Sequence, residues 1–280
     1  MNTALKRNYG KLFIEYVLLL IGLAVFIGPL LWLVSTMLKT RGQSMAYPPE
    51  WVPSPVTFEA FTRLFTNLPL ISHWFVNSFV ISISVAVGTV LSSSLVAFGF
   101  VRTRARSKNF LFIVVMITLM IPYQITLLPL YLIYKNIGWY DTWLPLIVPS
   151  FLGNAFFIFL FRQFFLTIPW ELDEATHMDG GNAWVVYTRI IMPLSVPVLM
   201  TGAIFSFVFS WVDFFSPFIF LQTPEKYTVS VGLQLLIGTQ SQDIPALAAG
   251  SFLSLLPIAA LYFFAQRYFK EGVVLTGGKG

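Results

Sequence analysis

The sequence has no cysteine, two histidines and few charged side chains, and each shortage excludes a class of protein. Without cysteine, the chain has no disulfide, no thiol nucleophile and no cysteine-ligated metal. His73 and His177 lie far apart in the sequence and lack the spacing of a histidine-built metal site. Charged residues make up 10% of the chain, against about 25% in soluble domains. This composition excludes an ordinary soluble domain.

Signatures of catalysis and of nucleotide binding are missing as well. A P-loop needs Gly-Lys followed by Ser or Thr so that backbone amides can cradle phosphates, but here Gly278-Lys279 is followed by Gly280. No nucleophile elbow, catalytic carboxylate pair or metal-binding helix motif is found. We therefore expect that the chain is not an enzyme, that it binds no metal or cofactor, and that partners supply any energy.

Long hydrophobic segments dominate the chain. Hydrophobic residues make up 57% of it, and the mean hydropathy is +0.78. A helix needs about 20 apolar residues to cross roughly 30 Å of hydrocarbon. Six segments meet this requirement: 14–37, 75–100, 110–134, 143–162, 196–221 and 247–267. The sequence predicts an all-α membrane protein with six transmembrane helices, the first retained rather than cleaved as a signal peptide.

Lysine and arginine residues predict the orientation of these spans. The net charge is +5, but the basic residues stand in short runs beside apolar segments, which indicates membrane orientation rather than nucleic-acid binding. Six spans place both termini on one side. That side then holds 12 basic residues: Lys6, Arg7, Lys11, Arg102, Arg104, Arg106, Lys108, Arg162, Arg189, Arg267, Lys270 and Lys279. The other side holds 5: Lys39, Arg41, Arg63, Lys135 and Lys226. Both termini are therefore expected in the cytoplasm. The cluster at 102–108 is interpreted as a positive-inside anchor rather than as a site that recognises substrate or lipid.

Prolines predict where the helices are interrupted. We expect interruptions inside the spans at Pro29, Pro122, Pro129, Pro145, Pro149 and Pro217. Broken helices at membrane depth are tolerated where they pack in protein or line a cavity. The proline-rich segment 39–74 is predicted to be an external loop, with Trp51 and Trp74 as interfacial anchors. We thus divide the chain into residues 1–74 (tail, first helix, external loop) and a core domain of five helices, 75–280.

Small residues recur at helical spacing in the second span. They are Ser78, Ser82, Ala86, Thr89, Ser93 and Ala97. Such a face favours close helix packing, and the same residues would also suit a solute-lining wall. Both roles can hold at different depths.

The segment 166–195, between the fourth and fifth spans, is polar and predicted to be cytoplasmic. Pro169 should open a helix with acids in its early turns, and Gly180-Gly181 should stop it. Asn182 can cap a second helix that carries Trp184, Tyr187 and Ile191 on one face and ends at Pro193. A helical hairpin lying on lipid is one interpretation. Lipid-surface helices usually carry Lys and Arg, however, so the acidic first helix favours a basic protein partner.

Asp213 is the acid well inside a predicted span. Burying a charge near the bilayer centre costs roughly 2.5–3.5 kcal/mol on insertion scales, and such residues usually face an interior or a water-filled path. Pro217 lacks the amide that would bond the carbonyl of residue 213. With Trp211, Phe214 and Phe215 nearby, this segment resembles a sugar site. A solute contact and a structural role such as helix pairing with a partner both remain open, and Asn154 and Gln124 are weaker candidates on the same grounds.

The cytoplasmic segment resembles a loop of the permease subunits of binding-protein-dependent ABC importers. Their pattern is Glu-Ala-Ala, three residues, Gly, nine residues, Ile, one residue and Leu-Pro. Glu174-Ala175-Thr176, Gly180, Ile190 and Met192-Pro193 keep this spacing, with Thr176 and Met192 as departures. The remaining motifs resemble the carbohydrate branch, in the maltose-type second permease: Asn77-Ser78, the cluster 102–108, Ile121-Pro122, Pro129-Leu130, 161–165, 211–215, 267–269, Gly272 and 277–280.

The resemblance implies a type I ABC importer permease that forms half of the pathway for a sugar or oligosaccharide. It also implies a multi-pass protein of the plasma (inner) membrane of a bacterium or archaeon. It implies as partners a second, different permease subunit, two ABC ATPase subunits that use ATP and Mg²⁺, an external solute-binding protein and membrane lipid. The loop would form the coupling helix, with Glu174 facing basic residues of the ATPase and Gly180 setting the turn. Its coupling residues would be Glu174, Ala175, Thr176, Asp179, Gly180, Gly181 and Pro193.

Two alternatives from other classes are kept. An ion-coupled secondary transporter would use Asp213 as its ion or proton site, although such proteins usually carry several intramembrane charges and paired repeats. An intramembrane enzyme would need clustered catalytic groups, which the sequence does not show.

Overall fold

The computed structural model describes residues 9–238 and 243–277 of the 280-residue chain, and every regular element among them is a helix. Lys6, Arg7 and Lys279 of the orientation argument lie outside the described residues. Four helical segments are long and apolar enough to span a membrane: Leu12–Met37, Ile71–Arg102, Leu144–Phe165 and Ile244–Gln266. The number rises to six if each of two bent helix pairs is counted as one span. All helices and four to six candidate spans among the described residues confirm the predicted all-α membrane fold.

Three of these segments are single continuous helices. They are α1 (Tyr9–Met37), α4 (Ile71–Arg102) and α15 (Ile244–Gly277). The fourth span consists of α7 (Leu144–Ile147), the 3-10 helix η1 (Val148–Leu152) and α8 (Ala155–Phe165). Gly153, with φ +91°, ends η1, because a left-handed backbone there suits a residue without a side chain.

One predicted span is broken at a proline as expected, at Pro122. The helix continues through Pro29 in α1 and through Pro129 in Tyr123–Asn136, so the interruptions predicted at those two prolines are wrong. The helices α5 (Lys108–Thr118) and α6 (Tyr123–Asn136) meet at 95°, with Pro122 at the start of α6. A second pair joins Ala183–Leu194, made of α10 (Ala183–Val185), η2 (Val186–Ile191) and α11 (Met192–Leu194), to α12 (Val196–Val212) at 78°. The predicted span 196–221 is itself broken after α12, and α13 (Phe215–Phe220) follows.

The chain divides into two compact units, one of residues up to Pro69 with Leu235–Leu255 and one of Leu70–Gln234 with the chain from Leu256. The boundary that the sequence suggested at residue 74 stays a prediction. The short helices α2 (Arg41–Ser44) and α3 (Glu59–Asn67) belong to the first unit. Because the segment 39–74 contains separate short helices, it does not form one continuous helix, and this agrees with the prediction.

Asp243 holds the first unit together. Its carboxylate is 2% exposed and accepts hydrogen bonds from Arg41 Nη2 at 2.7 Å and from Arg63 Nε at 2.9 Å. The amide of Ala246 donates to its second oxygen, which caps the start of α15. Two guanidinium groups thus compensate the buried carboxylate and fix α2 and α3 to the beginning of α15.

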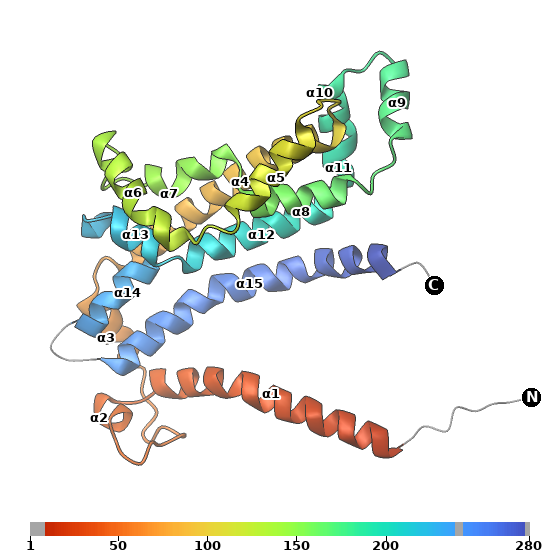
Figure 1. The fold of residues 1–280 in the computed structure, drawn as a ribbon. Helices are drawn as coiled ribbons and strands as arrows, with labels where there is room; N and C mark the ends of the chain where they lie inside the picture. The colour runs from red at the N-terminus through yellow and green to blue at the C-terminus, as the bar shows by residue number, and fades with distance from the viewer. Residues whose placement is uncertain (1–8, 239–242, 278–280) are drawn as a thin grey trace, which may run out of the picture. The chain divides into compact units, whose positions relative to one another are not determined.

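In the second unit α4, α8 and α12 lie side by side (Figure 1). Their shared core includes Ala97, Phe157, Phe161, Val198 and Leu199. The small residues predicted on one face of α4 are all buried, so close packing is the role that the structure supports for most of them. Thr89 of the same face also lines a cavity.

Trp74 was predicted at the membrane interface, and this prediction is wrong. Its side chain is buried, and its indole Nε1 donates to the carbonyl of Pro224 at 2.7 Å. Gly232 packs so closely on the indole that a Cβ there would lie 2.0 Å from Trp74 Cε3. A partner 150 residues away in the chain thus provides the polar contact that a tryptophan usually finds at an interface.

Asp141 joins the α6–α7 connection to the segment after α13. It accepts hydrogen bonds from the amides of Gln222 and Thr223 and from Lys226 Nζ. Burial acts to raise the pKa of Asp141, but the hydrogen bond from the Thr223 hydroxyl, together with those from the two amides and Lys226, outweighs it and holds the pKa well below its usual value. The carboxylate therefore stabilises the fold above about pH 4, the value for an unfolded chain.

We expect Asp141→Asn to lower the free energy of unfolding by about 2 kcal/mol at pH 7. Because the folded pKa is depressed, the wild-type advantage should be constant from pH 8 to about pH 5 and shrink as the pH falls through the folded value. Thermal unfolding in detergent, followed by tryptophan fluorescence, measures both. A difference that widens in acid would contradict this assignment.

Candidate functional site

The segment 166–195 forms the predicted helix, glycine turn and second helix. The first helix, α9 (Glu171–Met178), carries its acids in the first turn. Gly180 has φ +82°, a left-handed conformation that favours glycine. The side chain of Asn182 accepts a hydrogen bond from the amide of Val185 and so caps the helix that follows.

The second helix departs from the prediction in its end and in its face. It does not stop at Pro193 but continues through Leu194, and the chain bends at Ser195. A π-helical segment, Val186–Ile191, precedes Pro193, and its wider turn accommodates the missing proline amide. Tyr187 and Ile191 are buried as expected, whereas Trp184 is exposed.

Most residues that the resemblance assigns to coupling are accessible. Glu174, Ala175, Asp179 and Gly180 are exposed on α9 and its turn. Thr176 is half-buried, and its hydroxyl donates to the carbonyl of Leu172 at 2.8 Å.

Two further residues of this group are set by local geometry. Gly181 has no room for a side chain, because a Cβ would lie 2.6 Å from Thr176 Cγ2. Pro193 is exposed but lies on α11, beyond the π-helical segment. The structure therefore brings the group together around α9 and its turn, with Pro193 apart.

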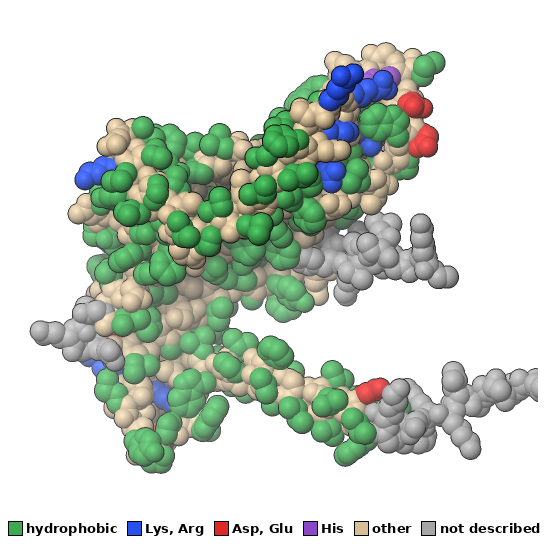
Figure 2. Space-filling view, in the orientation of Figure 1, with side chains coloured by type: hydrophobic (Ala, Val, Ile, Leu, Met, Phe, Trp, Pro, Cys, Tyr) green, Lys and Arg blue, Asp and Glu red, His purple; other side chains and the backbone are tan. Residues whose placement is uncertain are grey.

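The outer surface of α9 is both acidic and apolar. Glu171 and Glu174 are exposed, and so are the apolar side chains of Leu172 and Met178, the latter 87% exposed. Figure 2 shows acidic side chains on this side of α9 and basic ones nearby. An exposed methionine beside carboxylates suits a partner groove that offers both apolar contact and positive charge.

Asp173 lies on the inner side of α9 and is buried. The sequence did not predict a buried acid in this helix. Its side chain is 4% exposed, and its Oδ2 is 2.8 Å from Nε of Arg102 at the end of α4. Burial raises the pKa of Asp173, and the guanidinium of Arg102 opposes that shift. From the sequence, Arg102 was interpreted as part of a positive-inside anchor and of a family motif, and not as a partner of Asp173.

At the opposite end of the same unit lies a cavity of about 500 Å³. Figure 1 shows α9 at one end of the bundle and α6, α7 and α13 at the other. The cavity is lined from α4, α6, α8, α12, α13 and the segment α7–η1. Its polar groups are Thr89, Tyr123, Tyr134, Ser150, Asn154, Ser206, Ser210, Asp213 and Ser216.

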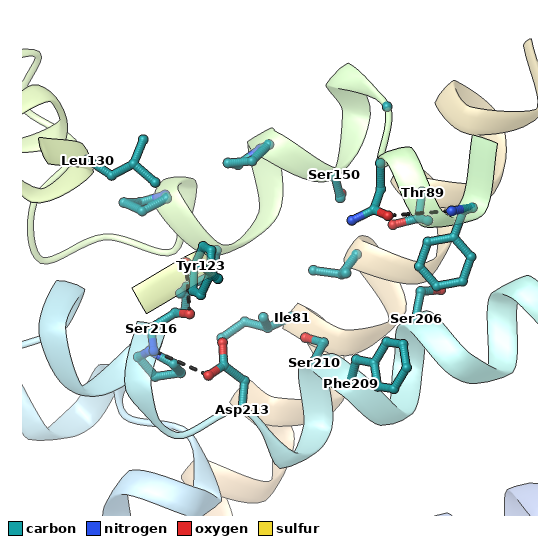
Figure 3. Close-up of a pocket in the computed structure, with 18 of the residues that line it drawn as sticks. Ile81, Thr89, Tyr123, Leu130, Ser150, Ser206, Phe209, Ser210, Asp213 and Ser216 are labelled. Carbon is teal, nitrogen blue, oxygen red and sulfur yellow. Dashed lines mark hydrogen bonds between the residues drawn. The ribbon is translucent and has the colours of Figure 1, made fainter. Parts of the chain in front are cut away.

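Asp213 lies in this cavity at the break between α12 and α13. Its carboxylate accepts a hydrogen bond from the amide of Ser216 at 3.2 Å, and the Ser216 hydroxyl is 3.1 Å from that of Tyr123 (Figure 3). The carbonyl of Asp213, predicted to be freed by Pro217, accepts a hydrogen bond from Ser230 Oγ at 2.7 Å. Hydrogen bonds to both the side chain and the backbone carbonyl of Asp213 thus fix the break between α12 and α13.

The structure separates the candidates for the solute pathway. Asp213 and Asn154 line the cavity, although the Asn154 side chain also caps α8 by accepting from the amide of Phe156. Trp211 is buried against Phe79, with ring centroids 4.7 Å apart.

The remaining candidates are not among the residues that line the cavity. Phe215 and Gln124 are exposed, and Phe214 stacks on Phe218. Sequence reasoning missed Phe209 and Ser210, which do line it. Among the residues that the structure describes, no three His, Asp or Glu side chains gather as metal ligands would.

Comparisons with known proteins all lead to one group. The model of the family described as "binding-protein-dependent transport system inner membrane component" matches residues 88–274. The arabinooligosaccharides transport system permease protein AraQ of Halalkalibacterium halodurans is 33% identical over 88% of this chain and 86% of its own length. The maltodextrin transport system permease protein MdxG of Bacillus subtilis is 32% identical, and each chain is covered completely.

Solved structures show the same fold. A chain from a bacterial ABC transporter involved in the import of the acidic polysaccharide alginate superposes with a TM-score of 0.81 at 20% identity. The match covers 96% of this chain and 99% of that one. A second chain, from a bacterial alginate ABC transporter in complex with a periplasmic protein that holds an alginate pentasaccharide, gives a TM-score of 0.67.

Proposed function

Because the chain belongs to the family of binding-protein-dependent transport system inner membrane components, we propose that it is the permease subunit of an ABC importer for a sugar or oligosaccharide. One observation carries the energetic part of this proposal. An exposed acidic helix, α9, and a glycine turn at φ +82° stand at the end of the bundle opposite the cavity.

The role proposed for α9 is docking on an ATPase subunit. Glu174 is exposed and accessible to a basic groove, while Leu172 and Met178 offer apolar contacts beside it. The chain shows no P-loop pattern, which supports ATP and Mg²⁺ binding by that partner. This chain would then bind no cofactor and catalyse no reaction itself.

We further propose the assembly and its orientation. The partners are a second, different permease subunit, two ABC ATPase subunits and an external solute-binding protein, and lipid surrounds the helices. Both termini lie in the cytoplasm, as the distribution of basic residues favours. The solved alginate transporter in complex with a periplasmic protein supports a similar docking of a binding protein here.

The solute class rests on the relatives and on the cavity. The relatives are named for arabinooligosaccharides and maltodextrin. A cavity of about 500 Å³ lined by hydroxyls, one carboxylate and the rings of Tyr123 and Phe209 combines the polar groups and aromatic faces that suit a sugar. A secondary transporter built on Asp213 is not retained, because the family is one of binding-protein-dependent transport.

Purification of the tagged chain from its native membrane tests the assembly. We expect ABC ATPase subunits and a second permease to co-purify, and ATP hydrolysis in proteoliposomes to rise when the solute-loaded binding protein is added. Uptake by the purified chain alone, driven by an ion gradient and indifferent to ATP, would contradict the proposal.

Replacement of Asp213 tests the solute pathway. We expect Asp213→Asn to reduce ATP-driven uptake of radiolabelled maltotriose or arabinotriose about tenfold, because a charged acceptor that contributes roughly 1.5–3 kcal/mol is lost. Protein abundance should be unchanged. The matched control is Glu225→Gln, since Glu225 is an exposed acid that does not line the cavity. If affinity, stability and uptake all stay at the parent level, Asp213 does not belong to the pathway.

A further inference from the structure

The end of α4 is joined to the inner side of α9 by a buried ion pair. Nε of Arg102 lies 2.8 Å from Oδ2 of Asp173, and the two side chains are 8% and 4% exposed. Asp173 directly precedes Glu174, the exposed acid proposed to face the ATPase. The two sides of one helical turn therefore carry an inward and an outward carboxylate.

Arg102 also fixes the chain that leads into α9. Its Nη2 donates to the carbonyl of Ile168 at 3.1 Å, and its guanidinium lies 4.9 Å from the ring centroid of Trp170. Ile168 in turn is buried in the core that α4, α8 and α12 share. One arginine thus holds the start of α9 through a charge, a carbonyl and an aromatic face.

Stability alone is a poor explanation for this pair. Removing two charges from water is costly, and apolar side chains of similar volume commonly stabilise a fold equally well. Asp173 Oδ1 has no hydrogen-bond partner within the described residues, so the carboxylate is incompletely compensated. What the pair provides, and apolar contact does not, is one defined position of α9 relative to α4.

The second arm of the same segment is tied to α4 as well. The hydroxyls of Tyr187 and Ser94 are 2.8 Å apart, and Phe98 packs on the Tyr187 ring at 5.2 Å between centroids. Ser94 and Arg102 lie about two helical turns apart on α4. Farther along the same helix Ile81, Val85 and Thr89 line the cavity.

We propose that Arg102 and Asp173 are positioning residues that transmit the movement of α9 to α4 and so to the wall of the cavity. This proposal rests on the proposed function, because it needs an ATPase that moves α9. The Tyr187–Ser94 contact joins α4 to the segment 166–195 at a second point. We therefore expect α4 to move when this segment moves.

The test replaces the pair by apolar side chains in the complete transporter. Arg102→Met with Asp173→Leu keeps the volume and removes both charges, so that no lone charge is buried. The matched control is Arg104→Met, which removes a charge from the same basic cluster at an exposed position. A positive-inside anchor alone predicts equal effects of Arg102 and Arg104 replacements.

For the double variant we expect uptake of radiolabelled maltotriose or arabinotriose to fall about tenfold or more, because small misplacements of a transmitting element have large effects on rate. ATPase subunits should still co-purify, and their ATP hydrolysis should no longer respond to the binding protein. Arg102→Asp with Asp173→Arg should recover part of the uptake. Arg104→Met should behave as the parent.

Uptake at the parent level by the double variant, Arg102→Met with Asp173→Leu, would overturn the proposal. So would loss of the ATPase subunits from its purified complex, or failure of that variant to accumulate in the membrane, because the pair would then serve assembly or folding. Failure of the proposed function is distinguishable, since Glu174→Lys would then also import normally and no ATPase would purify with the unaltered chain.

Discussion

Replacing Glu174 by lysine is expected to abolish solute uptake while leaving insertion of the chain into the membrane intact. Glu174 is exposed and takes part in no ion pair among the described residues, so its replacement should leave α9 folded. Opposite a basic partner surface, however, reversing one charge costs several kcal/mol. Uptake by the reconstituted transporter should therefore fall about a hundredfold or more.

The same helix offers a control for this prediction. Glu171 is also acidic and exposed, and it lies at the start of α9. Glu171→Lys changes the net charge equally but not at the position that the family pattern assigns to coupling. We expect it to keep at least half of the uptake, roughly the effect of a rim charge. Normal uptake by Glu174→Lys would remove α9 from the coupling path.

The parts of the site that could be predicted are those encoded by neighbouring residues. Pro169 and the acids that follow define the start of α9, Gly180 supplies the left-handed turn, and Asn182 caps the next helix. Each signal acts within a few residues, through backbone geometry or a local hydrogen bond. The six apolar segments are similarly local, because length and composition decide whether a helix can span a membrane.

The parts that could not be predicted depend on partners distant in the chain. Arg102 contacts Asp173 only because the fold places the end of α4 beside α9, the helix that follows α8. Trp74 finds the carbonyl of Pro224 in the same way. Composition and spacing describe the two residues of each pair separately, so an arginine in a basic cluster was interpreted as an anchor and a tryptophan as an interfacial side chain.

The cavity was predictable in part, because the residues of α12 that line it recur with a helical period in the sequence. Ser206, Phe209, Ser210 and Asp213 recur at the spacing of one helical face and all line the cavity. Trp211 stacks on Phe207 on another face, with ring centroids 5.7 Å apart. Grouping Trp211 with Asp213 by closeness in sequence thus mixed two faces that helical spacing keeps apart.

Replacing Gly180 by proline should be as damaging as the charge reversal, for a different reason. Proline fixes φ near −65° and has no amide hydrogen, whereas Gly180 has φ +82° and donates to the carbonyl of His177 at 3.0 Å. The turn after α9 cannot form with proline in place, so α9 would lose its position relative to η2. We expect uptake to fall about a hundredfold or more, with the transmembrane helices still inserted.

Asparagine at the same position separates backbone conformation from side-chain volume. It tolerates the left-handed region better than other residues with a side chain, and no atom lies within 4 Å of a Cβ built on Gly180. Gly180→Asn should therefore keep most of the uptake. Gly180→Val, whose Cβ also has open space but whose backbone is strained by about 1–2 kcal/mol, should fall between the asparagine and proline variants. An order other than Asn, Val, Pro, measured as uptake per inserted transporter, would show that the left-handed turn is not what positions α9 for its partner.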